Sequence, residues 1–160
     1  MAKVKSIPDG YRTITPYITV RGAAHAIDFY KRAFGAEERE RMPGPDGKSV
    51  MHAELKIGDC IVMISDEQPG GCRAPLSVGA PTSYLYLYVP DVDKTFNQAV
   101  RAGAKVVMPV SDMFWGDRFG QVEDPSGHRW GLATHKEDVR PDDMAKRAKE
   151  FFAKMSPDKK

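Results

Sequence analysis

Residues 14–38 read ITPYITVRGAAHAIDFYKRAFGAEE and hold a strand pattern followed at once by a helix pattern. From Thr13 to Val20 the chain is rich in β-branched residues, which predicts a strand. From Ala23 to Phe34 apolar residues recur at helical spacing, which predicts an amphipathic helix. Gly35 stands where a helix commonly ends on a left-handed residue. A strand that leads directly into a helix is therefore expected as the first unit of the fold.

Three more strands are expected between this helix and a loop rich in Gly, Pro and Ser at residues 68–81. The hexapeptide PGPDGK, residues 43–48, is a strong turn pattern, and Gly58-Asp59 is a second one. The residues around these turns have the composition and alternation of strands. The expected strands are Glu37–Met42, Val50–Ile57 and Cys60–Ile64. The first half of the chain therefore has the order βαβββ.

The same order of elements returns in the second half of the chain. Val20 and Val89 lie 69 residues apart, and so do Gly58 and Gly127. The second set comprises a strand at Ser83–Val89, a helix at Val92–Ala102, and strands at Lys105–Val110, Phe119–Glu123 and His128–Thr134. The chain is therefore a diverged tandem repeat of two βαβββ modules.

Four segments of this repeat resemble a known family. They are ITPYITVRGAAHAIDFYKRAFGAEE, MPGPDGKSVMHAELKIGDCIVMISDE, YLYVPDVDKTFNQAVRAGA and FWGDRFGQVEDPSGHRWGLATH. In this order they are similar to the PhnB-like branch of the vicinal oxygen chelate superfamily, which includes glyoxalases, bleomycin-resistance proteins and dioxygenases. The resemblance implies an α+β fold in which two tandem modules form a half-open mixed β-barrel around a ligand. It predicts one domain over residues 10–138, with modules at about 12–67 and 82–136.

The C-terminal segment, residues 139–160, is expected to add a helix and a tail to this domain. Within Pro141–Met155, apolar residues recur at helical spacing among charged ones, which predicts an amphipathic helix docked on this subunit or on a neighbour. The family resemblance implies a homodimer, and the need to cover sheet edges and the pair Phe151 and Phe152 favours one as well. The modules can pair within one chain or between chains.

The composition excludes several classes of protein. Apolar residues make up 41% of the chain and charged residues 29%, and no run approaches the about 18 apolar residues that span a bilayer. The N-terminus lacks the apolar core of a signal peptide, so a cytoplasmic location without membrane association is expected. A formal charge of +2, with acids and bases interspersed, argues against nucleic acid as a partner. Cys60 and Cys72 are not expected to form a disulfide.

The resemblance also specifies where metal-dependent relatives carry their ligands, on the first and last strand of each module. The matching residues here are Thr15, Tyr84, Val62 or Met63, and Gly131. None is a histidine or a carboxylate, the side chains that divalent ions favour at such sites. We therefore expect no metal and no other cofactor. Glyoxalase I chemistry, which needs the ion to stabilise an enediolate, is not expected.

The strand alternation predicts which side chains face the concave side of the sheets. Ile14, Ile18 and Val20 on the first strand, and Met51, Ala53, Leu55 and Ile57 on the third, are expected under the helices. The expected ligand-binding residues on the concave side are Thr15, Tyr17, Tyr84 and Tyr86, joined by Trp115 and Arg118 from a loop. This lining favours a small aromatic or cationic compound as the ligand, held by stacking and cation–π contacts. The alternative is ordinary packing of tyrosines on a solvated sheet.

His52 and Glu54 are the candidate catalytic residues, because they lie two apart on one strand face. Such a pair can exchange a proton with a substrate, as in a lyase or an isomerase. It can also supply two ligands of a displaced metal site, as in a metal-dependent dioxygenase-like enzyme. The cluster of Trp115, Asp117 and Arg118 has two interpretations. It forms either a mobile flap over the ligand or a structural Asp–Arg pair that organises the loop. A third hypothesis for function is an interaction module that depends on the C-terminal helix.

Overall fold

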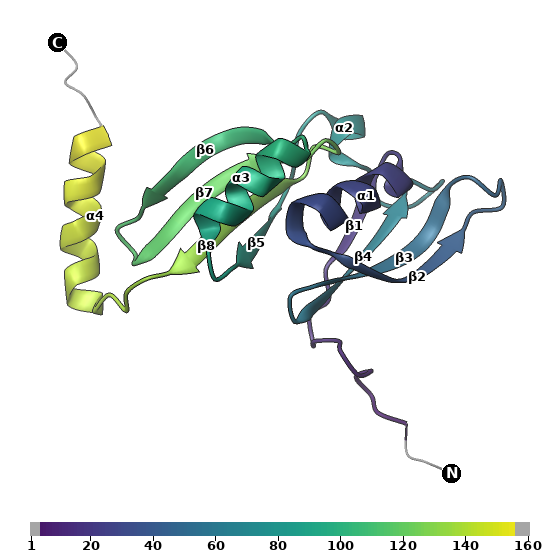
Figure 1. Ribbon diagram of the computed structural model, residues 1–160, viewed down its shortest axis with the longest axis horizontal. Helices are drawn as coiled ribbons and strands as arrows, with labels where there is room; N and C mark the ends of the chain where they lie inside the picture. The colour runs from purple at the N-terminus through teal and green to yellow at the C-terminus, as the bar shows by residue number, and fades with distance from the viewer. Residues whose placement is uncertain (1–3, 156–160) are drawn as a thin grey trace.

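The computed structural model describes residues 4–155, and its first half is one βαβββ module (Figure 1). Its elements are β1 (Tyr17–Val20), α1 (Ala23–Phe34), β2 (Glu37–Pro43), β3 (Val50–Ile57) and β4 (Cys60–Asp66). They form a mixed sheet in the order β1-β4-β3-β2, in which β1 runs parallel to β4 and the other pairs are antiparallel. The predicted order of elements is confirmed for this module.

The second half repeats the same topology. Its elements are β5 (Tyr84–Tyr88), α3 (Val92–Ala102), β6 (Lys105–Asp112), β7 (Asp117–Glu123) and β8 (Arg129–His135). The sheet order is β5-β8-β7-β6, again with the first strand parallel to the last. The linker carries a short helix that the sequence did not predict, α2 (Pro75–Val78). The α+β class and the tandem repeat are both confirmed.

Helices α1 and α3 begin and end at residues that the sequence dictates. Both end on glycines with left-handed backbone, Gly35 at φ 66° and Gly103 at φ 116°, which a side chain would strain. The N-terminus of α1 is capped from β4, because the backbone N–H groups of Gly22 and Ala23 donate to Asp66 Oδ1 at 2.7 and 2.8 Å. These caps fix where each helix lies on its sheet.

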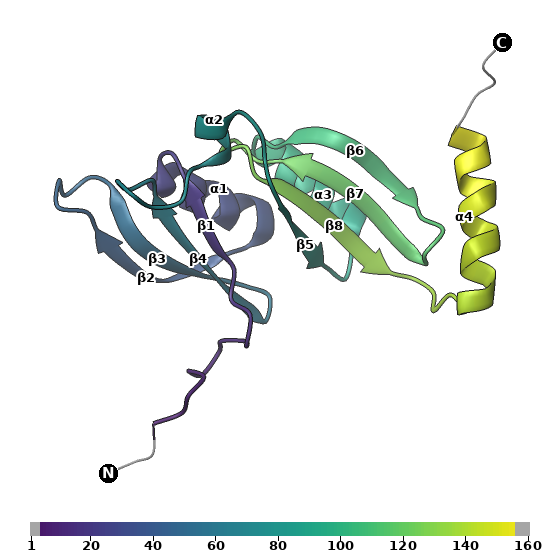
Figure 2. The same ribbon diagram turned by 180° about the vertical axis from the view of Figure 1, so that it is seen from behind.

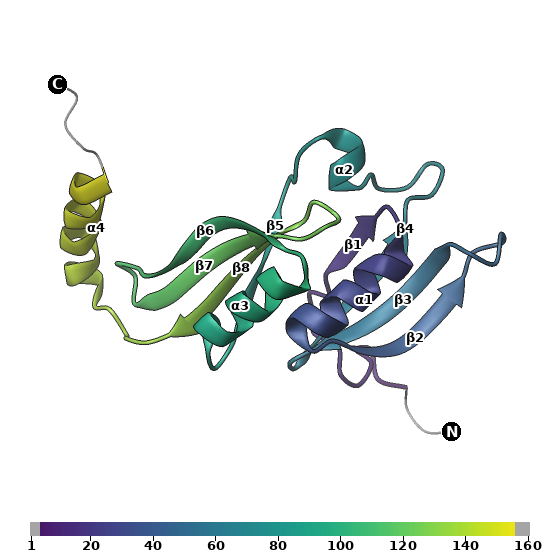
Figure 3. The same ribbon diagram turned by 45° about the horizontal axis from the view of Figure 1, so that its top comes forward.

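The two helices lie on the same side of the molecule and leave the other side of both sheets uncovered. Figure 1 shows α1 and α3 in front of their sheets, and Figure 2 shows the uncovered faces from behind. The helices contact each other at the junction of the modules, as Figure 3 shows. Strands β1 and β5 both face this junction but belong to separate sheets. The barrel is therefore half-open, as predicted.

A buried carboxylate, Asp124, holds the modules together. It lies in the turn between β7 and β8, and its Oδ2 accepts hydrogen bonds from the Tyr30 hydroxyl of α1 at 2.6 Å and from Trp130 Nε1 at 2.9 Å. Its Oδ1 accepts from the backbone N–H of Ser126 and His128. Because Tyr30 belongs to module one and Trp130 to module two, one side chain links both halves of the core.

Strand β1 is shorter than predicted. It begins at Tyr17 rather than Thr13, and Ile14 is 84% exposed instead of lying under α1. Pro16 interrupts the segment because it has no N–H to donate to a neighbouring strand. The Thr15 hydroxyl donates to the carbonyl of Arg12 at 3.1 Å. The predicted positions of Ile14 and Thr15 on the strand were therefore wrong.

A bulge in β3 changes the register at its start. Met42 pairs with His52 but Pro43 pairs with Val50, so Met51 is an extra residue on β3. As a result Val50 is buried and Met51 is exposed, which corrects the prediction that Met51 packs under the helix. Beyond the bulge the predicted alternation holds, with Ala53, Leu55 and Ile57 in the core.

The last element, α4 (Pro141–Met155), is present as predicted. It lies beyond the outer end of module two, next to the loop between β6 and β7 (Figure 1), and none of its residues is buried. Residues 156–160, predicted as a tail, lie outside the described residues. Among residues 4–155, no helix has the length and apolar content needed to cross a membrane.

Candidate functional site

The uncovered face of module two carries a row of aromatic rings, which we call the aromatic face. It consists of Tyr84, Tyr86 and Tyr88 on β5 and Phe119 on β7. The three tyrosines are 54%, 37% and 61% exposed. Tyr86 stacks on Phe119 with ring centroids 5.3 Å apart and an interplanar angle of 13°. Tyr84 and Tyr86 therefore lie on the solvent side of the sheet, as the alternation predicted.

Gly131 on β8 makes room for these rings. A Cβ atom at this position would lie 2.8 Å from Phe119, 3.1 Å from Tyr86 and 3.2 Å from Tyr84. Such separations are too short for carbon atoms in contact, so the rings occupy the space that a side chain would need. This is the position where metal-dependent relatives of the resembled family are expected to carry a ligand. Here it serves instead as the floor of the aromatic face.

A buried carboxylate, Asp117, lies beside the aromatic face. It begins β7 and is only 3% exposed. Its Oδ2 accepts hydrogen bonds from the hydroxyls of Tyr86 and Tyr88, both at 3.0 Å, and from Trp115 Nε1 at 3.1 Å. Its Oδ1 contacts His135 Nδ1 at 2.8 Å. We call these five residues the Asp117 cluster.

The environment of Asp117 keeps it ionised. Burial acts to raise its pKa, but the hydrogen bonds from His135, Tyr88, Tyr86 and Trp115 together hold the pKa below its ordinary value. Conversely, burial and the neighbouring carboxylate raise the pKa of Tyr86 and of Tyr88, so both hydroxyls keep their protons.

His135 connects the Asp117 cluster to the segment before α4. Its Nε2 lies 3.0 Å from Asp138 Oδ1, so the imidazole stands between two carboxylates. The hydrogen bonds to Asp117 and then to Asp138 raise the pKa of His135 above its ordinary value. Protonation of this ring is therefore favoured in the fold.

Arg118 does not lie with the aromatic residues. Its guanidinium pairs with both oxygens of Asp93 on α3, at 2.6 and 2.7 Å, and with Asp112 at 3.2 Å. Successive strand residues point to opposite faces, so Arg118 points toward the helix while Asp117 points toward the rings. Of the predicted loop cluster, the structure thus groups Trp115 with Asp117 and separates Arg118 from them.

The uncovered face of module one carries the predicted catalytic pair. His52 Nε2 lies 3.7 Å from Glu54 Oε1, and His52 Nδ1 lies 3.1 Å from the Tyr17 hydroxyl. Tyr11, in the segment before β1, donates its hydroxyl to Glu54. That hydrogen bond is the main reason that the pKa of Tyr11 rises to about 12. Sequence reasoning did not find Tyr11, because it precedes every predicted element.

The positions that hold metal in the resembled family do not present metal ligands here. Of the two candidates on β4, Met63 faces the uncovered side beside Glu54, whereas Val62 pairs with Leu55 and is buried. Thr15 precedes its strand, and the other two positions hold a tyrosine and a glycine. Within residues 4–155, no three His, Cys, Asp or Glu side chains gather as a metal site would require. The residues present do not fit a divalent ion.

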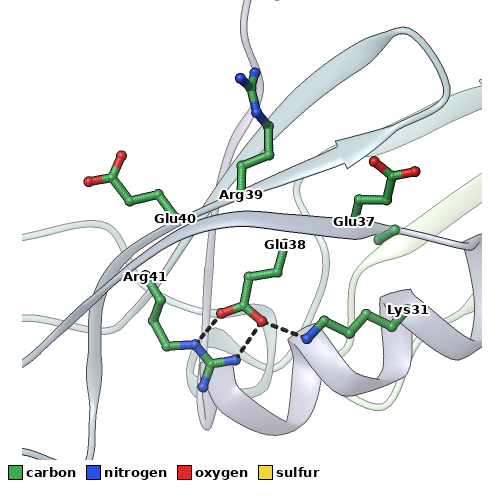
Figure 4. A pocket seen from close by; sticks show the side chains of 7 residues that line it. Lys31, Glu37, Glu38, Arg39, Glu40 and Arg41 are labelled. Atoms are coloured by element: carbon green, nitrogen blue, oxygen red, sulfur yellow. Dashed lines mark hydrogen bonds and ion pairs between the residues drawn. The ribbon is translucent and has the colours of Figure 1, made fainter.

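A separate groove follows the edge strand β2 and is lined by charges rather than rings (Figure 4). Glu38 accepts hydrogen bonds from Arg41 at 2.5 and 3.0 Å and from Lys31 at 2.6 Å. The side chains of Glu37, Arg39 and Glu40 point away from Glu38. Charged side chains on an edge strand discourage pairing with another sheet. We therefore interpret the charges that line this groove as protection of the β2 edge against pairing, rather than as a binding site.

Comparison with known proteins finds both a family and its fold. The sequence model of the Glyoxalase/Bleomycin resistance protein/Dioxygenase superfamily matches residues 12–132. An uncharacterized protein of Mycobacterium bovis, Mb0911c, is 44% identical over 135 residues, which span 82% of this chain and 88% of the relative.

Solved structures agree with this result. The crystal structure of TioX from Micromonospora sp. ML1 is 28% identical, with a TM-score of 0.61 and coverage of 78% of this chain and 98% of that one. The PhnB protein from Bacillus cereus is 20% identical, with a TM-score of 0.60 and coverage of 77% and 99%, which shows a shared fold.

Proposed function

The chain belongs to the Glyoxalase/Bleomycin resistance protein/Dioxygenase superfamily, and we propose that within it the chain is a metal-independent binding protein for a small planar organic compound. The observation that carries this proposal is the aromatic face with its solvent-exposed rings. Aromatic rings contribute large contact areas at low cost in conformational entropy, and each favourable ring pair adds about 0.5–1.5 kcal/mol. A planar ligand that lies on these rings would exploit both effects.

Metal independence is supported by the chemistry of the four ligand positions. Threonine and tyrosine hydroxyls are poor ligands unless ionised, methionine sulfur does not favour hard ions, and glycine has no donor. In addition, the rings of Tyr86 and Phe119 occupy the space above Gly131. A ligand is therefore held by stacking and hydrogen bonds rather than through an ion.

We further propose that a second copy of the chain covers the uncovered faces and encloses the ligand. Each module leaves one sheet face open, and strands β1 and β5, with sequences YITV and YLYLY, have unpaired edges at the junction of the modules that carry no charged residue. The edge strand β2 is protected by charges, but these two strands are not. A homodimer accounts for this difference. Sedimentation analysis over a range of concentrations measures it directly, and a monomer at all concentrations would contradict it.

A ligand screen tests the binding function. Planar aromatic compounds, neutral and charged, are added to the purified protein while tyrosine and tryptophan fluorescence and the melting temperature are followed. We expect hits whose effects are lost in Tyr86→Leu. The matched variant Tyr17→Leu removes a tyrosine from the face of module one and should retain the response. A diverse screen without any response would overturn the proposal.

An enzyme that uses His52 and Glu54 is the second candidate. The observation in its favour is the network that joins these side chains to Tyr17 and Tyr11. Such a network can hold His52 as a general base toward a substrate on the face of module one. Metal analysis of protein purified without chelators tests the metal-dependent form of this candidate. Stoichiometric zinc, nickel, iron or manganese that is lost in His52→Ala would overturn metal independence.

A further inference from the structure

We propose that the aromatic face selects a planar organic cation, because Asp117 supplies a buried negative charge at the hydroxyl ends of two of its rings. This inference rests on the proposed binding function and names the ligand class. A permanently charged, ring-containing ammonium or pyridinium-type compound fits the site. Three observations carry the inference: the charge balance of the Asp117 cluster, the orientation of its hydrogen bonds, and the exposure of the rings.

The charge of Asp117 is not neutralised by a permanent cation. Within residues 4–155, no lysine or arginine pairs with it, and its ionisable partner is His135. His135 is shared with Asp138, so two carboxylates stand against at most one imidazolium. The three side chains therefore keep a net negative charge even when the histidine is protonated.

Two arginines on strands β7 and β8 are already paired with other carboxylates. Arg118 pairs with Asp93 and Asp112, on the side toward α3. Arg129, opposite Tyr84 in the sheet, pairs with Glu123 at 2.9 Å. Neither guanidinium contributes an unpaired positive charge to the aromatic face.

The hydrogen bonds of the cluster all point toward the carboxylate. The hydroxyl hydrogens of Tyr86 and Tyr88 and the Trp115 N–H are all donated to one oxygen, Oδ2 of Asp117. The hydrogens of these groups therefore point toward Asp117, whereas the tyrosine side chains stay partly exposed. A ring face attracts a cation through its quadrupole, and the attraction grows when water is excluded.

The exposed rings are placed to receive such a ligand. Tyr88, the most exposed, donates directly to Asp117, and its ring centroid lies 5.0 Å from that of Tyr86. A planar cation against these rings gains stacking from the tyrosines and attraction to the carboxylate that accepts their hydroxyl groups. A neutral compound of the same shape gains only the stacking. An anion would be repelled.

Two probes of matched shape test the inference on the unaltered protein. N-methylquinolinium carries a permanent charge, whereas quinoline is neutral at about pH 8, where both are compared by fluorescence titration and calorimetry. We expect N-methylquinolinium to bind at least about ten-fold more tightly, equivalent to about 1.4 kcal/mol. We expect Asp117→Asn to abolish this preference while Asp112→Asn, which removes a surface charge from β6, preserves it.

Each outcome decides between the inference and the proposed function. Equal binding of the two probes would overturn the cation preference and leave the binding function standing. Binding of neither probe would overturn the inference, and the diverse ligand screen then decides the binding function. A preference that persists in Asp117→Asn would remove Asp117 from the explanation. Since the comparison of the probes uses the unaltered protein, it remains decisive even where Asp117→Asn fails to fold.

Discussion

Two buried aspartates, Asp117 and Asp124, use the same chemistry for different purposes. Each accepts hydrogen bonds from tyrosine and tryptophan side chains. Asp124 lies between the modules, where its partners Tyr30 and Trp130 are buried with it. Asp117 lies beside an open sheet face, where the rings that it binds are exposed on their other side. Asp124 therefore stabilises the fold, whereas we propose that Asp117 also attracts a ligand that lies against the rings.

The stabilising role of Asp124 predicts the effect of Tyr30→Phe. This change removes a buried hydrogen bond to a charged group, which contributes about 1.5–3 kcal/mol. We expect the free energy of unfolding to fall by about 2 kcal/mol in urea denaturation. Tyr17→Phe, which removes the exposed hydroxyl that contacts His52, serves as the control and should cost far less. An equal loss in both variants would contradict the role of Asp124 as the link between the modules.

The position of His135 predicts a pH dependence. Its pKa is raised by the hydrogen bonds to Asp117 and Asp138, so the folded state binds this proton more tightly than the unfolded state does. The resulting stabilisation is complete below the ordinary histidine pKa of about 6.5 and is lost as the pH rises through the raised value. NMR titration of the imidazole measures the shift directly. In Asp138→Asn we expect the pKa of His135 to move back toward its ordinary value.

At the scale of elements, the strands of each module differ in the residues that they carry at the edges and in the middle of the sheet. Strand β2 carries a charged edge, whereas β1 and β5 carry apolar and aromatic residues next to open backbone. Strand β8 lies in the middle of its sheet, where Gly131 allows side chains from β5 and β7 to lie flat across it. The shape of the aromatic face thus depends on one residue of a strand that contributes no ring to it.

This dependence predicts that Gly131→Ala damages the site more than the fold. The added methyl group meets the rings of Phe119 and Tyr86, which must move away from the sheet. We expect a loss of stability of about 1–3 kcal/mol, typical of overpacking, together with loss of the fluorescence response to bound ligand. Unchanged affinity in Gly131→Ala would show that the rings do not form the binding surface.

The attachment of α4 predicts that its removal leaves both modules folded. The helix contacts module two through Phe151 and Phe152, which pack on Phe114, and through the pair of Arg147 with Glu137. None of its residues is buried. A chain that ends at residue 138 should therefore lose only the helical circular dichroism signal of α4 and should keep its cooperative unfolding. Its tryptophan fluorescence should shift, because Phe151 packs in the same cluster as Trp115. Loss of cooperative unfolding would show that α4 belongs to the core.

At the scale of the whole molecule, the uncovered faces of the two modules lie on one side, and helices α1 and α3 lie on the other (Figure 2). The contact between α1 and α3 and the hydrogen bonds of Asp124 hold this arrangement. The chain therefore presents two chemically distinct faces at once. One is the aromatic face with its buried anion, and the other is the network of His52 and Glu54. A second copy that covers both faces would shield the aromatic face and the network of His52 and Glu54 from solvent.

The sequence by itself determined the repeated βαβββ order, the limits of α1, α3 and α4, and the faces of most strands. Those features depend on the periods of 3.6 and 2 residues and on terminal glycines, which are local properties of the chain. It also placed Tyr84 and Tyr86 together, and His52 beside Glu54, because residues two apart on a strand share a face.

Only the tertiary structure decided which side chains meet across strands. Asp117 gathers residues from β5, from β8 and from the loop before β7, and no period of the sequence encodes those distances. The bulge at Met51 and the ion pairs of Arg118 depend likewise on the neighbouring strand and helix. Hydrogen bonds and register are set by where separate segments lie in space, so the buried anion beside the aromatic face was found only in the folded chain.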